Sequence, residues 1–127
     1  MIPLFLDMER VMRIHQSMIN TYGGVAGLRD PGLLHSAIAI PQASFSGECL
    51  HKDIFEMGAA YLYHITQNHP FIDGNKRTGA ATAIVFLAMN GIIIQADEDG
   101  LFKITLSVAK GEAGKEKVAE FFRQRVE

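Results

Sequence analysis

The sequence is poor in features that mark special classes of protein. It has one cysteine, Cys49, so a disulfide within the chain is excluded, and a free thiol fits a reducing compartment. Lys and Arg number 12 against 14 Asp and Glu, for a formal net charge of −2. General nucleic-acid binders usually carry an excess of positive charge. We therefore expect no direct contact with nucleic acid.

No apolar run is long enough to cross a membrane. The longest extends from Gly79 to Met89 and ends at Asn90-Gly91, whereas a spanning helix needs about 20 residues. The first residues, Met1 to Asp7, lack the basic segment that precedes the apolar core of a signal peptide. These absences predict a cytoplasmic protein without membrane association.

The length and composition indicate one folded domain. The chain has 127 residues, of which 48% are hydrophobic and 20% charged, as in globular proteins. It contains no repeat, low-complexity tract or linker. We expect a single domain that covers residues 1–127.

Apolar residues recur at helical spacing along most of the chain. Asp7, Asp30 and Asp53 each stand where an N-cap is expected. A surface loop or short flap is expected from Gln42 to Lys52, and a short extended piece from Ile92 to Ile94. The predicted helices cover residues 7–22, 31–41, 53–69, 75–90, 97–110 and 114–125.

The helix predicted at residues 75–90 is apolar on nearly all sides, which indicates that it is buried in the centre of the domain. The other predicted helices are mostly amphipathic. The sequence therefore predicts an all-α fold: a compact domain of about six helices around a central buried helix, with at most one short hairpin or flap.

A group of polar residues, His69 to Arg77, directly precedes this buried helix. A helix N-terminus has unpaired N–H groups and a partial positive charge, so it attracts anions. Gly74 allows a sharp turn and the close approach of a ligand. Asn75, Lys76 and Arg77 can contact phosphate oxygens. The segment is a candidate phosphate-binding site.

Asp73 and His69 add two functions to this site. A carboxylate beside phosphate oxygens is a common way to hold Mg²⁺. An imidazole is a suitable general base near neutral pH. Phosphoryl transfer depends mostly on positioning and charge stabilisation, so these groups suffice for it.

Each fragment of the segment also has a simpler explanation. His-Pro often ends a helix, Asp-Gly-Asn usually forms a turn, and Lys-Arg usually lies on a solvated face. Packing does not require all of them within nine positions ahead of a buried helix. Their joint occurrence favours a functional site.

The run from His69 to Thr78, His-Pro-Phe-Ile-Asp-Gly-Asn-Lys-Arg-Thr, resembles the motif of the Fic/Doc family, His-x-Phe-x-Asp/Glu-Gly-Asn-Gly/Lys-x-x-Arg in outline. It is most similar to the Doc (death-on-curing) branch, the toxins of toxin–antitoxin pairs. The likeness includes Tyr22-Gly23-Gly24 and residues 27–34 and 96–99, and so covers nearly the whole chain. It implies the helical Fic/Doc fold, with ATP as substrate and Mg²⁺ as cofactor.

The resemblance implies a role for each residue of the motif. His69 would deprotonate the hydroxyl of the target, Asp73 would help to hold Mg²⁺, and Phe71 would be a buried anchor of the loop. The implied phosphate-binding group comprises Gly74, Asn75, Lys76 and Arg77.

Two departures from the family's AMP-transferring pattern decide which reaction we favour. Lys76 stands where that pattern has a second glycine, and Ala80 stands where it has its last arginine. Both changes suit a nucleotide whose γ-phosphate lies in the cradle. We therefore expect a kinase that phosphorylates a threonine of elongation factor Tu and so inhibits translation.

An AMP-transferase is the first alternative function, and a catalytically silent binding module is the second. A metal-dependent nuclease is disfavoured because paired metal carboxylates and a basic excess are lacking.

Inhibition is expected to come from another chain. Many Fic proteins carry an inhibitory helix with Ser/Thr-x-x-x-Glu-Gly/Asn, and the nearest run here, Ser44 to Glu48, is followed by Cys49. The resemblance therefore implies a cognate antitoxin whose disordered tail folds on binding.

The other histidines are expected to have ordinary roles. His15 lies on the apolar stripe of the first predicted helix and should be half-buried and hydrogen-bonded. His35 and His51 are expected on the surface, with His51 in a possible flap near the target. His64 and His69 are five positions apart, which does not suit a zinc site on one helix face. The methionines of the first helix are expected in the core.

Overall fold

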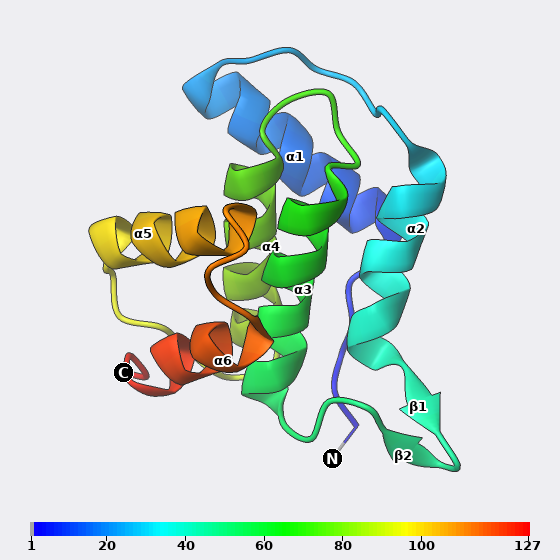
Figure 1. The fold of residues 1–127 in the computed structure, drawn as a ribbon, viewed down its shortest axis with the longest axis vertical. Helices are drawn as coiled ribbons and strands as arrows, with labels where there is room; N and C mark the ends of the chain where they lie inside the picture. The colour runs from blue at the N-terminus through cyan, green and yellow to red at the C-terminus, as the bar shows by residue number, and fades with distance from the viewer. Residues whose placement is uncertain (1) are drawn as a thin grey trace.

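The computed structural model describes residues 2–127 and is all-α apart from one short hairpin (Figure 1). The helices are α1 (Met8–Tyr22), α2 (Pro31–Ala39), α3 (Ile54–Asn68), α4 (Asn75–Met89), α5 (Glu98–Ala109) and α6 (Lys115–Arg123). A 3₁₀ turn, Ile40–Gln42, extends α2. Strand β1 (Ser44–Phe45) pairs antiparallel with β2 (Glu48–Cys49). The predicted fold class is confirmed.

Four helices begin at an aspartate whose side chain accepts a hydrogen bond from the main-chain N–H three residues later. Such a cap stabilises a helix by about 1 kcal/mol. The predicted caps of α1, α2 and α3 are confirmed, and α5 has a fourth. The caps are Asp7, Asp30, Asp53 and Asp97.

The centre of the domain is a pair of helices, α3 and α4, and not α4 alone. They pack closely because small residues face each other: a Cβ at Gly79 would lie 2.8 Å from Oγ1 of Thr66. Helix α3 also packs against α2, α5 and α6, which explains why it is buried at least as fully as α4. Val85, on the outer side of α4, remains partly exposed. The predicted buried helix is correct, but it shares the centre.

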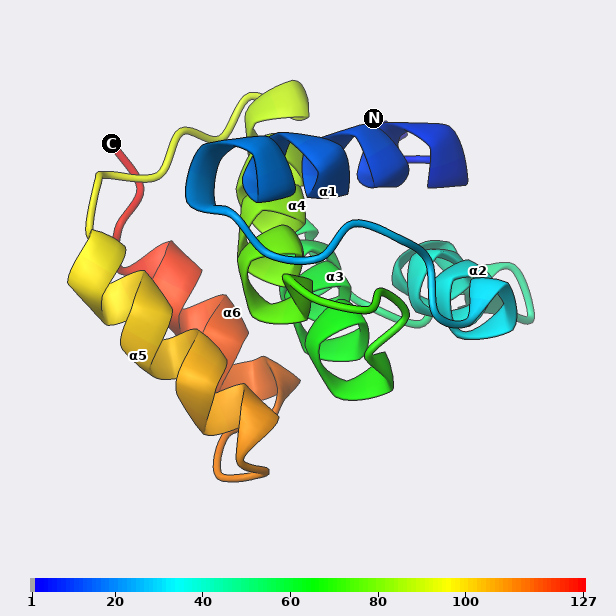
Figure 2. The ribbon, with the colours of Figure 1, turned by 90° about the horizontal axis from the view of Figure 1, so that it is seen from above.

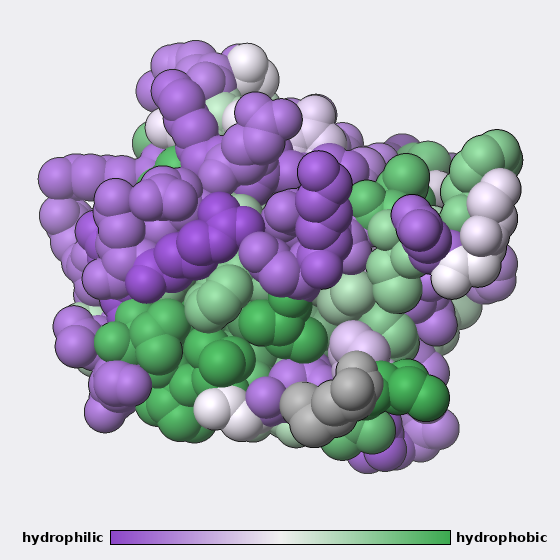
Figure 3. Space-filling model, turned by 90° about the horizontal axis from the view of Figure 1, so that it is seen from below, coloured by the Kyte–Doolittle hydropathy of each residue, from purple (hydrophilic) through white to green (hydrophobic). Residues whose placement is uncertain are grey.

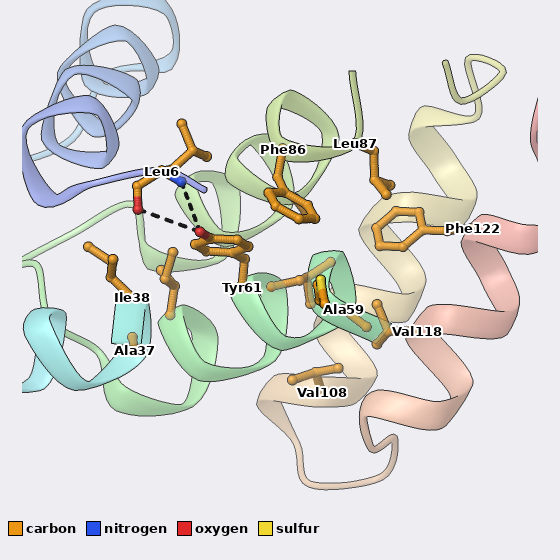
Figure 4. Close-up of a cluster of buried hydrophobic side chains, with 14 of the residues drawn as sticks. Leu6, Ala37, Ile38, Ala59, Tyr61, Phe86, Leu87, Val108, Val118 and Phe122 are labelled. Atoms are coloured by element: carbon orange, nitrogen blue, oxygen red, sulfur yellow. Dashed lines mark hydrogen bonds between the residues drawn. The ribbon is translucent and has the colours of Figure 1, made fainter. Parts of the chain in front are cut away.

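Tyr61 on α3 connects the core to the N-terminal segment (Figure 4). Its hydroxyl accepts a hydrogen bond from the N–H of Leu6 at 2.9 Å, and its ring lies 5.0 Å from that of Phe86. Burial raises the pKa of Tyr61 to about 12, so the hydroxyl stays protonated. The N-terminal segment is therefore part of the core.

The β1–β2 hairpin lies at the end of α3 opposite to the α3–α4 loop (Figure 1). A helix of 15 residues is about 22 Å long, so this hairpin lies far from the α3–α4 loop. The expectation that His51 is a surface residue is wrong, because only 5% of it is exposed. It contacts Lys115 of α6, whose Nζ lies 3.2 Å from the Nε2 of His51.

Two smaller expectations have mixed outcomes. His35 is exposed, as predicted. Met8 packs against the core, but Met12 is 43% exposed, so the expectation that all methionines of α1 lie in the core is wrong.

The face seen from below carries a broad apolar area beside polar ones (Figure 3). None of the helices in residues 2–127 has the length and apolarity that crossing a membrane requires.

Candidate active site

The α3–α4 loop begins and ends at residues in the left-handed region. His69, whose φ is +49°, directly follows α3, and Gly74, whose φ is +77°, directly precedes α4. A residue other than glycine rarely adopts such a φ, so its surroundings must hold His69 there. Pro70 follows and prevents the helix from continuing. The loop reverses the chain within a few residues.

The segment that links α1 to α2 holds this loop from outside (Figure 2). The N–H of Ile72 donates to the carbonyl of Gly27 at 3.0 Å, and the N–H of Arg29 donates to that of Pro70 at 2.8 Å. The Arg29 guanidinium also donates to the carbonyl of His69 at 2.7 Å. It therefore caps the C-terminal end of α3 beside the imidazole. Sequence reasoning missed Arg29, because its partner lies 40 residues further along the chain.

Asn75 fixes the loop from inside. Its Oδ1 accepts from the N–H of Phe71 at 2.9 Å, and its Nδ2 donates to the carbonyl of Phe71 at 3.0 Å. The same Nδ2 lies 3.4 Å from Nδ1 of His69. Phe71 is buried, as the resemblance implied. The Asn75 side chain thus holds the loop, and its main-chain N–H is left to face a ligand at the start of α4.

The first turn of α4 has no side-chain cap among the described residues, in contrast to the four helices that begin at aspartates. Its leading N–H groups, from Asn75, Lys76 and Arg77, are therefore available to an anion. Lys76 and Arg77 are exposed beside them. The Arg77 guanidinium lies 4.4 Å from the ring centroid of Tyr22 at the end of α1. This end of the helix can bind a phosphate group.

Asp73 is an exposed carboxylate at this helix end. Hydrogen bonds from the N–H of Val25 and then of Gly74, with a smaller contribution from the charges of Lys76 and Arg77, lower the pKa of Asp73 below its usual range. The group is therefore ionised at neutral pH. Its two hydrogen bonds, at 3.2 and 2.9 Å, leave lone pairs for a cation.

A magnesium ion fits this carboxylate only together with a nucleotide. Residues 2–127 contain no cluster of three His, Cys, Asp or Glu side chains that could hold a metal alone. Mg²⁺ is often bound by one carboxylate, phosphate oxygens and water, and Asp73 lies beside the candidate phosphate site. The donor set is consistent with such an ion.

His15 of α1 is a second residue of this site that sequence reasoning did not place there. It is hydrogen-bonded, as expected, and more fully buried than expected; its partner is the main-chain carbonyl of Asp73 at 2.8 Å. Its ring stacks on Phe71. The predicted residues from His69 to Arg77 thus gather at one helix end, and His15, Arg29 and Tyr22 complete their surroundings.

The fold and this site define a helical domain whose uncapped helix end is accompanied by an imidazole and a carboxylate. The chain matches the Fic/DOC family over residues 5–87. It is 35% identical to "Protein kinase doc" of Escherichia phage P1 over 116 residues, which cover 91% of this chain and 90% of that protein. It is 39% identical to "Toxin Doc" of Mycolicibacterium smegmatis over 95 residues, which cover 75% and 71% respectively. The chain belongs to the Fic/DOC family.

Proposed function

We propose that this chain is a Doc-type toxin that transfers the γ-phosphate of ATP to a hydroxyl group of a protein. The observation that carries the proposal is the uncapped start of α4, next to which the loop holds His69. The names of the two relatives, a protein kinase and a toxin, support it.

In this proposal the terminal phosphate of ATP lies against the leading N–H groups of α4. Lys76 and Arg77 offset its negative charge. Gly74 keeps the approach open, because its φ of +77° and the missing side chain let the main chain turn beneath the phosphate. Asp73 holds Mg²⁺, which when bound stabilises negative charge on the phosphate oxygens.

His69 accepts the proton of the target hydroxyl. A neutral imidazole that carries its own proton on Nδ1 has a free lone pair on Nε2 for this purpose. The amide nitrogen of Asn75 can only donate, so its contact with Nδ1 at 3.4 Å favours a proton on Nε2. A hydrogen bond of this length is weak, and in this proposal the ring takes the other tautomer when the target hydroxyl binds. As the hydroxyl oxygen forms its bond to the γ-phosphorus, the bond to the bridging oxygen breaks and ADP leaves.

Two residues favour γ-phosphate transfer over AMP transfer. Lys76 puts a long cationic side chain where AMP-transferring relatives have glycine, which crowds the approach of the inner phosphates. Ala80, one turn further along α4, cannot supply the contact of the missing arginine. Both features suit a nucleotide whose outermost phosphate is held at the helix end.

Incubation of a protein target with γ-labelled and, separately, α-labelled ATP tests the reaction. We expect label from the γ position only, and none from either with His69→Ala. Transfer of label from the α position alone would instead establish the AMP-transferase. Growth inhibition by His69→Ala equal to that of the parent protein would favour a binding module without catalysis.

We further propose elongation factor Tu as the target, through a threonine, and a cognate antitoxin as the partner. Purified elongation factor Tu should acquire phosphothreonine when it is incubated with the chain, Mg²⁺ and ATP. Transfer to other proteins of an extract but not to elongation factor Tu would contradict the target. The antitoxin should restore growth when both are expressed, and its tail should become ordered on binding.

A further inference from the structure

His15 is the one buried histidine that contacts the α3–α4 loop among the described residues. It comes from α1, 58 positions before its partner Asp73, and only 4% of it is exposed. We propose that His15 is a positioning residue, which orients the start of α4 and the Asp73 carboxylate by donating a hydrogen bond to the main-chain carbonyl of Asp73. The inference rests on the proposed function, because it assigns a residue to the same site.

The direction of this hydrogen bond follows from its partner. A carbonyl oxygen only accepts, so the Nε2 of His15 carries a proton and donates it over 2.8 Å. The carbonyl of Asp73 and the N–H of Gly74 belong to one planar peptide group. A donor that fixes the carbonyl therefore also fixes the N–H, which points the opposite way within the same plane.

The N–H of Gly74 in turn contacts the carboxylate of Asp73. The Gly74 N–H donates to Oδ1 of Asp73 at 2.9 Å. The chain of contacts thus runs from the imidazole through one peptide group to the proposed magnesium ligand. The same peptide group precedes the first turn of α4, so its orientation also determines where the leading N–H groups point.

The ring of His15 adds a second constraint on the loop. It stacks on Phe71 with centroids 3.8 Å apart and an angle of 4° between the planes. Phe71 is held from the other side of the loop by the Asn75 side chain, which bonds both its N–H and its carbonyl. The loop from Phe71 to Gly74 is therefore fixed at both ends, by Asn75 from α4 and by His15 from α1.

A role in packing alone does not account for a histidine at this position. A phenylalanine would provide the same flat ring without a polar nitrogen that loses its hydration on burial. The polar nitrogen of His15 helps to orient the loop only through its hydrogen bond to the carbonyl of Asp73. The two contributions, ring and donor, can be separated by substitution.

His15→Phe keeps a ring and removes the donor, whereas His15→Gln keeps a donor and removes the ring. The readout is the Kd of a non-hydrolysable ATP analogue with Mg²⁺, measured by calorimetry together with the Tm of each variant. We expect His15→Phe to raise the Kd about tenfold, as for residues that orient a metal ligand, and His15→Gln to stay within about threefold of the parent. His35→Phe and His35→Gln, at an exposed position, are the matched controls.

Two outcomes would overturn the inference. One is a His15→Phe variant that binds the nucleotide as tightly as the parent. The other is a Kd that rises equally in both variants and in proportion to the loss of Tm, which would indicate a merely structural role.

Hydrogen exchange separates this inference from the proposed function, since it needs no nucleotide. His15→Phe should speed exchange at the Gly74 amide, which is hydrogen-bonded to Asp73, while the core amides of α3 keep their rates, and His15→Gln should keep exchange at Gly74 slow. Equal exchange in all variants, or faster exchange along the whole chain, would overturn the positioning role. If the parent protein fails to bind Mg²⁺ and ATP at all, the proposed function fails, and the exchange result still decides what His15 does.

Discussion

The Nζ of Lys115 lies 3.1 Å from the Nε2 of His64, which joins the first residue of α6 to α3. The same Nζ lies 3.2 Å from the Nε2 of His51. An ammonium group only donates, so both imidazoles accept through Nε2 and are neutral in this arrangement. The turn before α3, α3 itself and α6 are therefore held together by groups that acid would charge.

Stability should fall as the pH drops from about 6.5 to 4. Burial, and then the charges of Lys115 and His51, lower the pKa of His64 to about 4 from the 6.5 of an unperturbed ring. Burial and Lys115 also lower the pKa of His51, against the opposing effect of Glu56. Between those values the unfolded chain binds more protons than the folded one, so acid favours unfolding. Because the His64 ring is partly solvated, we expect a loss of about 1–2 kcal/mol between pH 7 and 4.5 in urea unfolding.

Substitution of the ring by a group that does not titrate provides the control. His64→Gln should show a flatter dependence of the free energy of unfolding on pH over this window. His35→Gln, on the exposed surface of α2, should behave as the parent does. An equally steep dependence in His64→Gln would exclude the cluster as the cause.

Gly74 should tolerate no side chain, for two separable reasons. Gly74→Ala forces alanine into a φ of +77° and brings its Cβ within 3.3 Å of Cδ1 of Ile19. Gly111 has the same φ with nothing within 4 Å of a Cβ, so Gly111→Ala measures the strain alone. We expect Gly111→Ala to lose about 1 kcal/mol and to keep the affinity for ATP. Gly74→Ala should lose more stability and most of the affinity; equal effects at the two positions would contradict this.

Arg29 should affect the reaction rate more than nucleotide binding. Its guanidinium donates to the carbonyls of His69 and Asn68, and Arg29→Ala leaves both without this partner. We expect a lower kcat with little change in the KM for ATP, because the main chain that carries the imidazole loses its support while the α4 end is intact. Arg10→Ala, at an exposed position of α1, is the control. A rise in KM with an unchanged kcat would show that Arg29 acts on the nucleotide instead.

The loop and the anion site should both depend on the amide group of Asn75. Asn75→Asp keeps the acceptor for the Phe71 N–H, but it loses the donor to the Phe71 carbonyl and adds a negative charge at the anion site. The variant should lose about 1–3 kcal/mol of stability and nearly all binding of ATP. Asn20→Asp on α1, which is exposed, should change neither in thermal unfolding and calorimetry. Retained ATP binding in Asn75→Asp would contradict the anion site.

The helices and the loop that bears the motif could be predicted from the sequence because their causes are local. The Asp30 cap acts over three residues, the periodic apolar positions over two turns, and Pro70 on its immediate neighbours. The segment from His69 to Arg77 is contiguous, so its residues lie together in any fold in which α4 follows the loop. The motif of the family resemblance lies in the same contiguous residues, and the rest of the resemblance lies in short local segments such as residues 27–34.

Contacts between distant segments depended on the tertiary structure. His15 and His51 were expected to be ordinary core and surface residues, and Arg29 was given no role of its own. Their partners lie 58, 64 and 40 positions away, respectively. The sequence by itself determined the elements and the chemistry of one loop, since hydrogen bonds and periodicity along a helix span only a few residues. Which side chains support that loop was decided only by the packing of α1 and the α1–α2 segment against it, and no pattern within a single segment records such packing.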